Sequence, residues 1–130
     1  MNGKWSYRSF YHDQIMLKDG HVDGTPHLAI PWTPPGALDV NTNESGEVVG
    51  TLTFAPSVTL KITGRLIPAA DPLPASIELT GEGLSAVYKI KGFFIPGSDH
   101  VVGTVLNLAN DLAHQPVGTI GPFVLFPAKA

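Results

Sequence analysis

The pair Asp99-His100, which follows Ser98, is the only one in the sequence in which an acidic residue directly precedes a histidine. A carboxylate can orient and charge an imidazole for general acid–base work. Neighbouring residues of extended backbone point to opposite faces, however, and Asp is common in turns because it hydrogen-bonds its own backbone. The pattern therefore favours a turn at Asp99. Acid–base chemistry is the alternative, with His12, Asp99 and His100 as its candidate catalytic residues.

Histidines and aspartates between His12 and His27 are of the types that ligate metals. Their spacings match no zinc signature, and the Asp-rich part lacks the pattern and the closing Glu of an EF-hand loop. A solvated loop is therefore expected, with no metal site. No cofactor is expected either, because a glycine-rich phosphate loop is absent from the sequence. The residues concerned are His12, Asp13, Asp19, His21, Asp23 and His27.

Another polar group, made of Asn107, Asn110, Asp111 and His114, follows an apolar run. Asn110 is a plausible N-cap for one helical turn over Asn110–His114. Capping is therefore favoured over function here.

Aromatic side chains alternate along two predicted strands. Trp5, Tyr7, Ser9 and Tyr11 share one face of the first strand, and Tyr88 shares a face with Ile90 and Phe94 further along the chain. Aromatic walls with a few hydroxyls are typical of a small-molecule pocket, and they are equally typical of a filled barrel core. The candidate ligand-binding residues are Tyr7, Tyr11, Trp32, Tyr88 and Phe94.

Period-two alternation between short Gly- and Pro-rich turns predicts an all-β fold. Eight strands in a meander must hide their edges, and closure into a barrel does so. An eight-stranded barrel is filled by side chains or holds one small ligand. We expect a single domain over residues 1–130, an antiparallel eight-stranded up-and-down barrel, with a β-sandwich as the alternative. The expected strands are 4–12, 37–43, 47–55, 58–67, 75–81, 86–95, 101–109 and 118–127.

Two short sequence repeats place a glycine inside a strand. Val48-Val49-Gly50-Thr51 recurs as Val101-Val102-Gly103-Thr104. A glycine within a strand suits a bend or a close approach of a neighbouring backbone. Gly50 and Gly103 are therefore expected at such places in a small, curved barrel.

Gly3-Lys4-Trp5, which opens the first predicted strand, resembles the Gly-x-Trp signature of the calycin barrels, which include lipocalins, fatty-acid-binding proteins and avidins. The resemblance implies a barrel whose base is closed by Trp5. The lipocalin pattern sets an Arg near the last strand over this Trp, and here only Lys129 is available. The avidin pattern lines its pocket with several tryptophans, and here only Trp32 accompanies Trp5. The resemblance therefore implies the architecture and no particular ligand.

The composition limits the possible partners. Hydrophobic residues make up 43% and charged residues 15% of the chain, which indicates a packed core and a nearly neutral surface. The basic residues are scattered, so a nucleic-acid partner is not expected. There is no cysteine, which excludes disulfides, and neither a signal peptide nor a membrane span is predicted. A soluble, cytoplasmic protein without a membrane partner is the expectation.

The last predicted strand, Thr119–Phe126, is apolar on both faces. A strand buried on both faces needs a cover outside the barrel. The long Pro- and Gly-containing segment Asp13–Pro35, expected over one mouth or along the wall, could provide it. A second subunit could also provide it, so a homo-oligomer is expected.

Three functions follow from these patterns. The first is binding of a small apolar molecule in the lumen. The alternative is a cofactor-free enzyme of isomerase or cyclase type that uses the same lumen. The third is a scaffold subunit of a homo-oligomer that has no ligand.

Overall fold

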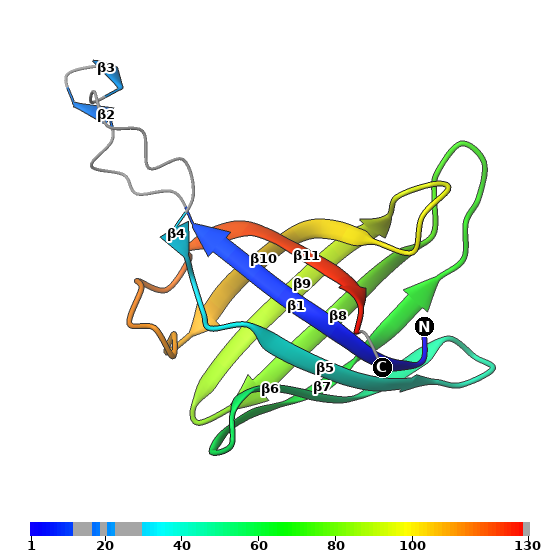
Figure 1. Ribbon diagram of the computed structural model, residues 1–130, viewed down its shortest axis with the longest axis horizontal. Coiled ribbons are helices and arrows are strands. Elements are labelled where there is room, and N and C mark those ends of the chain that lie inside the picture. Colours follow the sequence, from blue (N-terminus) through cyan, green and yellow to red (C-terminus); the bar gives the residue numbers. More distant parts are fainter. Residues whose placement is uncertain (12–16, 19–20, 23–29, 129–130) are drawn as a thin grey trace.

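The computed structural model describes residues 1–11, 17–18, 21–22 and 30–128 of the chain, and eight of its strands form a closed antiparallel barrel (Figure 1). The predicted barrel is therefore confirmed over the sandwich. The barrel strands are β1 (Gly3–Tyr11), β5 (Gly36–Thr42), β6 (Glu47–Ala55), β7 (Val58–Ile67), β8 (Ser76–Gly83), β9 (Ala86–Phe94), β10 (Val101–Ala109) and β11 (Ile120–Pro127).

Closure depends on β1, which pairs on both of its edges. Trp5 lies opposite Leu38 of β5 on one side and opposite Pro127 of β11 on the other. The other neighbours follow chain order, as in a meander. Three two-residue strands are added to the barrel strands: β2 (Leu17–Lys18) pairs with β3 (His21–Val22), and β4 (Ile30–Pro31) pairs with the end of β1.

The interior is filled by the alternating side chains that the sequence predicted. In β9, Tyr88 and Ile90 are buried and Phe94 is half-buried, while Lys91 and Phe93 face outward. Burial of these apolar faces stabilises the fold, at about 25 cal/mol per Å². The buried apolar residues of the barrel strands include Trp5, Tyr7, Leu38, Val40, Val48, Leu52, Leu60, Ile62, Ile77, Leu79, Tyr88, Ile90, Val101, Val105, Phe123 and Leu125.

Gly50 and Gly103 lie where neighbouring backbones approach closely, as predicted. A Cβ atom at Gly50 would lie 2.0 Å from the carbonyl oxygen of Asp39, and one at Gly103 would lie 1.9 Å from that of Lys91. Backbone atoms occupy the space of a side chain at both positions, so only glycine fits.

The two ends of the barrel differ. We call the end where β1, β6, β8 and β10 finish the mouth, and the opposite end, which carries the N-terminus and the turn between β9 and β10, the base. Trp5 is buried near the base, edge-on to Phe94 at 6.4 Å between ring centroids, and its indole nitrogen donates to the Asn2 carbonyl over 3.3 Å.

The helical turn expected over Asn110–His114 is wrong. The segment makes one hydrogen-bonded turn, in which the His114 amide donates to the Asp111 carbonyl over 3.0 Å, and Asn110 has a left-handed φ of 47°. Asn107 is buried at the end of β10, where its side-chain amide donates to the carbonyls of Gln115 and Pro116. This polar group therefore anchors the loop between β10 and β11.

In the part of the chain that the structure describes, no helix is long and apolar enough to cross a membrane.

Candidate functional site

Trp32 is held over the lumen at the mouth. Its backbone amide donates to the Ser9 carbonyl over 3.0 Å, directly after β4 pairs with the end of β1. Its ring is 4% exposed and lies edge-on to Tyr11 and to Tyr88, with centroids 6.3 Å away in both cases. Aromatic edge contacts of this kind contribute about 0.5–1.5 kcal/mol each. Trp32 therefore closes the mouth as a fixed side chain.

The carboxylate of Asp111, from the loop between β10 and β11, fixes this tryptophan. Its Oδ2 accepts hydrogen bonds from the Trp32 indole nitrogen at 2.9 Å and from the Gln115 amide at 2.8 Å. Its Oδ1 accepts one from the Tyr88 hydroxyl at 2.5 Å. Asp111 is only 6% exposed, so these three donors replace water around a buried carboxylate.

The Tyr88 hydroxyl connects the barrel wall to the same loop. It donates to Asp111 and accepts the Leu112 amide over 2.7 Å. Burial raises the pKa of Tyr88, and the hydrogen bond to the Asp111 carboxylate and the negative charge of that carboxylate raise it further. The hydroxyl therefore stays protonated at neutral pH and serves as a donor.

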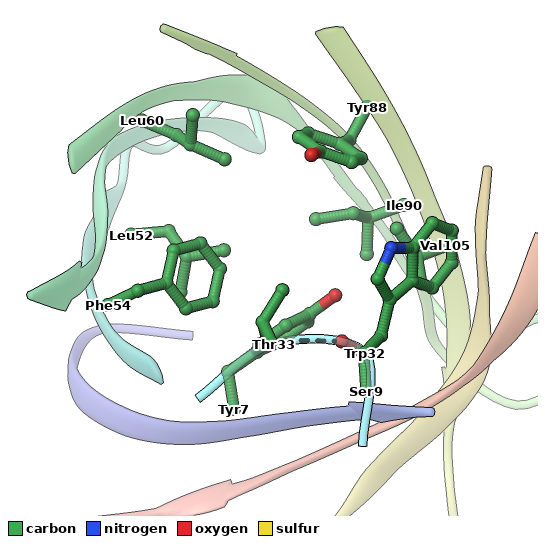
Figure 2. Close-up of a pocket in the computed structure, with 10 residues that line it drawn as sticks. All are labelled: Tyr7, Ser9, Trp32, Thr33, Leu52, Phe54, Leu60, Tyr88, Ile90 and Val105. Carbon is green, nitrogen blue, oxygen red and sulfur yellow. Dashed lines mark hydrogen bonds between the residues drawn. The ribbon is translucent and has the colours of Figure 1, made fainter. Parts of the chain in front are cut away.

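Below Trp32 the barrel encloses a small space, which we call the inner cavity (Figure 2). Its volume is about 10 Å³, which is room for about one water molecule. Ser9 Oγ lies 3.3 Å from Thr33 Oγ1 on its wall. Burial raises the pKa of Tyr7, and the neighbouring Ser9 hydroxyl opposes that rise. The cavity is lined by Tyr7, Ser9, Trp32, Thr33, Leu52, Phe54, Leu60, Tyr88, Ile90 and Val105.

A larger space, which we call the mouth hollow, lies on the outer side of the same residues. Its volume is about 360 Å³. Trp32, Thr33 and Phe54 line both it and the inner cavity, so these three side chains separate the two spaces. Its other lining residues come from β6, β7 and the loops at the mouth, and they are Pro34, Ala55, Val58, Leu84, Leu112 and Ala113.

The structure brings most of the predicted ligand-binding residues together. Tyr7, Tyr11, Trp32 and Tyr88 lie at or just below the mouth, where Tyr11 and Tyr88 contact the Trp32 ring. Phe94 lies apart from them, beside Trp5 near the base. Of the five, only Trp32 lines the mouth hollow itself.

The predicted catalytic candidates are not at the mouth. Asp99 and His100 are exposed in the turn between β9 and β10, with 3.4 Å between Asp99 Oδ1 and His100 Nδ1. The Ser98 amide donates to the Ile95 carbonyl over 3.0 Å, which is turn geometry, and the His100 ring stacks on Phe126. His12 lies outside the described residues. The isomerase or cyclase alternative stays a prediction.

The histidines and aspartates between His12 and His27, whose residue types ligate metals, also lie outside the described residues, except for the backbone of His21 in β3. Among the residues that are described, no three histidine, aspartate or glutamate side chains are grouped so that they could hold a metal ion.

Sequence reasoning missed two parts of this site. The sequence pattern favours a capping role for the group that contains Asp111, although a lone carboxylate after an apolar strand also suits a buried acceptor. Thr33 has no signal in the sequence, because it lies in an irregular Pro-rich segment where no periodicity shows which way a side chain points.

No protein-family model, curated protein or solved structure matches this chain. The class of the protein therefore comes from its own geometry. It is a closed eight-stranded antiparallel β-barrel with a filled lumen and an apolar hollow at one mouth.

Proposed function

We propose that this protein binds a small apolar molecule in the mouth hollow. The observation that carries the proposal is the apolar space of about 360 Å³ against Trp32, a size within the range of about 300–1,000 Å³ that small-molecule sites occupy. Its walls come from Trp32, Phe54, Leu84 and Leu112. Burial of an apolar ligand against such walls is favourable at about 25 cal/mol per Å².

The inner cavity argues for binding at the mouth rather than deep in the lumen. At about 10 Å³ it holds no organic molecule. In this proposal Tyr88 and Tyr11 support Trp32, and the ligand contacts the outer side of Trp32. Asp111 keeps that ring in place through the indole nitrogen.

A calycin-like relationship is part of the proposal. What supports it is the closed eight-stranded barrel, together with Trp5 buried near the base. Gly3 precedes it with a φ of 86°, a left-handed value that glycine adopts readily.

Titration with α-methylstyrene, a small apolar probe, tests the proposal. We expect saturable binding and a shift of the Trp32 indole N–H resonance, which is assigned through a Trp32→Phe variant. Leu84→Lys should weaken binding about fivefold to tenfold, since it replaces an apolar wall by a charge. Leu73→Lys is the matched control, because Leu73 is 61% exposed, close to the 60% of Leu84, but lies in the loop between β7 and β8 near the base.

Two results would count against mouth binding. Absence of saturable binding would reject the proposal. An equal loss of affinity in Leu84→Lys and Leu73→Lys would show that the probe does not use the mouth hollow.

A second candidate function, assembly of identical copies, is favoured by the outer face of β10 and β11. Both neighbouring strands carry outward charges, such as Arg8 on β1 and Lys91 on β9, whereas the outward residues of β10 and β11 are uncharged. The Arg8 guanidinium lies 5.5 Å from the centre of the Phe126 ring, so it borders this face on the side of β1. With Phe93 this face forms a continuous apolar surface, since Phe93 and Val124 both pair with Val102. The outward residues are Val102, Thr104, Leu106 and Leu108 of β10 and Ile120, Pro122, Val124 and Phe126 of β11.

The size of this face, with its charged borders, suits a weak interface with a second copy of the chain. The four strands from β9 to β1 are about 14 Å wide and about 30 Å long, which gives a flat area of about 420 Å² before side-chain relief is added. That area is about half of the roughly 800 Å² per partner of a standard interface and lies in the range of weak or transient interfaces. Because the outward residues of β10 and β11 are uncharged, this part of the face can meet its own copy without like-charge repulsion.

Sedimentation velocity tests assembly. We expect a dimer for the natural chain and a monomer for Val102→Lys. Val49→Lys, on the outer face of β6, is the control and should stay dimeric, because Val49 is also exposed but lies away from this face. A natural chain that is monomeric at sub-millimolar concentration would reject this candidate.

A further inference from the structure

The connections between strands differ in charge at the two ends of the barrel. Each of the three connections at the base exposes a carboxylate, from Glu44, Asp71 and Asp99. The described connections at the mouth contain no lysine, arginine or glutamate; their one aspartate, Asp111, is buried, and their one histidine, His114, is exposed. The exposed surface of these connections is therefore nearly free of charge. They are residues 32–35, 56–57, 84–85 and 110–119.

Each of these mouth connections instead exposes an apolar side chain. Leu84 is 60% exposed in the turn between β8 and β9, and Val117 is 64% exposed in the loop between β10 and β11. Pro34, Pro35 and Pro56 are exposed in the other two connections. Figure 1 shows these connections at the same end of the barrel, on the left. We call these five residues the mouth rim; Pro34 and Leu84 also line the mouth hollow, so the rim borders an apolar opening.

An uncharged rim of this kind fits a lipid surface. Entry into the boundary between the headgroups and acyl chains of a bilayer is favourable for apolar side chains and costly for charged ones. Along β7 and β8, the first charged residues below the rim are Lys61 and Glu82, which lie opposite each other on the outer wall. Glu82 lies two residues, or about 7 Å, from Leu84. The rim can therefore enter a bilayer by about 5–7 Å before a charge is buried, a depth typical of interfacial segments.

We propose that the mouth rim docks on the surface of a bilayer whose phospholipids carry no net charge. The described mouth connections contain no lysine or arginine to attract anionic lipids, and the carboxylates at the base stay in water in this orientation. Separate turns also suit a fluid surface, whereas a folded partner needs a matching shape. Small apolar molecules collect in bilayers, so docking opens the mouth hollow toward its ligand; this step alone rests on the proposed function.

The sequence predicts no membrane partner because it contains no long apolar run. A rim made of four separate connections leaves no such run, since each connection contributes only one or two exposed apolar residues.

Flotation with phosphatidylcholine vesicles at about pH 8, where histidines are mostly neutral, tests the docking. We expect the natural chain to float, and Val117→Lys and Pro56→Lys each to lower its partition onto the vesicles about fivefold or more, because a charge then enters the bilayer boundary. Neither residue lines the mouth hollow, so both variants should bind α-methylstyrene like the natural chain. Leu73→Lys is the matched control, since Leu73 is 61% exposed near the base, and should float like the natural chain. Added phosphatidylserine should not raise the partition.

The two tryptophans of the chain report which end meets the lipid. Trp32 lies at the mouth and Trp5 near the base. Phosphatidylcholine with brominated acyl chains quenches tryptophan fluorescence at short range. We expect it to quench Trp32 in the variant Trp5→Phe and to leave Trp5 unquenched in the variant Trp32→Phe. Quenching of Trp5 alone would overturn the proposed orientation.

The outcomes separate the docking from the proposed function. If α-methylstyrene binds but the natural chain does not float, the docking is wrong while binding at the mouth stands. If the natural chain floats through its rim but binds no probe, the proposed function fails while the docking stands. Equal loss of flotation in Val117→Lys and Leu73→Lys, or flotation only with phosphatidylserine, overturns the docking. So does a loss of self-association in Val117→Lys without any flotation of the natural chain, which would make a second copy the occupant of the rim.

Discussion

Replacing Asp111 by Ala should loosen the mouth of the barrel, because the Asp111 carboxylate accepts hydrogen bonds from three donors, two of them buried and one partly buried. These are the Trp32 indole N–H, the Tyr88 hydroxyl and the Gln115 amide, at 2.9, 2.5 and 2.8 Å. The methyl group of alanine accepts none of them. Trp32 then loses its only side-chain hydrogen bond among the described residues, and the loop between β10 and β11 keeps the bond from the Leu112 amide to the Tyr88 hydroxyl but loses the one from that hydroxyl to Asp111.

The expected cost follows from these contacts. A hydrogen bond to a charged group contributes about 1.5–3 kcal/mol, but three such bonds do not add fully, because removal of the carboxylate also removes its desolvation penalty and water can reach the mouth. We expect a loss of about 3–5 kcal/mol in the free energy of unfolding. A typical domain has about 5–15 kcal/mol in total, so the effect is large.

Asp111→Asn should cost less. The amide oxygen can still accept from Trp32 and Gln115, whereas the amide nitrogen cannot accept the Tyr88 proton. One donor of the three is then lost, and we expect about 1–2 kcal/mol.

Urea unfolding followed by circular dichroism measures these losses, and the chemical shift of the Trp32 indole proton reports its hydrogen bond. Asp99→Ala is the control, since Asp99 is exposed in a turn at the base and should change stability by less than about 0.5 kcal/mol. If Asp111→Ala stays within about 1 kcal/mol of the natural chain and the indole resonance does not move, the carboxylate does not hold Trp32 and the reasoning is refuted.

Two further predictions concern the barrel itself. Burial raises the pKa of Tyr7 and of Tyr88 above the ordinary value of 10.0, so the unfolded chain ionises first as pH rises. Stability should therefore be complete below pH 10.0 and fall above it by up to about 1.4 kcal/mol per pH unit for each tyrosine. Unfolding free energies at about pH 9 and about pH 11 measure this, and an equal loss in Tyr7→Phe would contradict the assignment to Tyr7. Gly103→Ala should destabilise by about 3 kcal/mol or prevent folding, because its Cβ would lie 1.9 Å from the Lys91 carbonyl oxygen. Thr104→Ala, on the outer face, should change the melting temperature little, and an unaltered melting temperature in Gly103→Ala would contradict the close approach.

The strands could be predicted because their signal is local. The alternation of apolar and polar residues indicates which face of a strand points into the barrel. In β9, for example, Tyr88 and Ile90 point inward and Lys91 points outward. The Pro and Gly residues between the runs mark where the strands end, so half of the predicted limits agree with the observed ones and the other half differ by one or two residues.

Two side chains on the same face of a strand need not belong to the same site. Phe94 and Tyr88 lie on the same face of β9, so the alternation alone predicts both as ligand-binding residues. Six residues of extended chain separate them by about 20 Å, which is most of the length of the barrel. Phe94 therefore packs on Trp5 near the base, while Tyr88 lies at the mouth.

The sequence by itself determined the all-β class, the positions of the eight strands and the inward face of the strands in which polar and apolar residues alternate, because alternation and turn residues act over a few neighbours. Only the tertiary structure decided that β1 closes on β11, that the lumen is filled and that a hollow lies at one mouth. It also decided that Asp111 meets Trp32, 79 residues away in the chain. Contacts of that kind depend on barrel closure and on the path of irregular loops. The alternation of residues along a strand predicts neither of these.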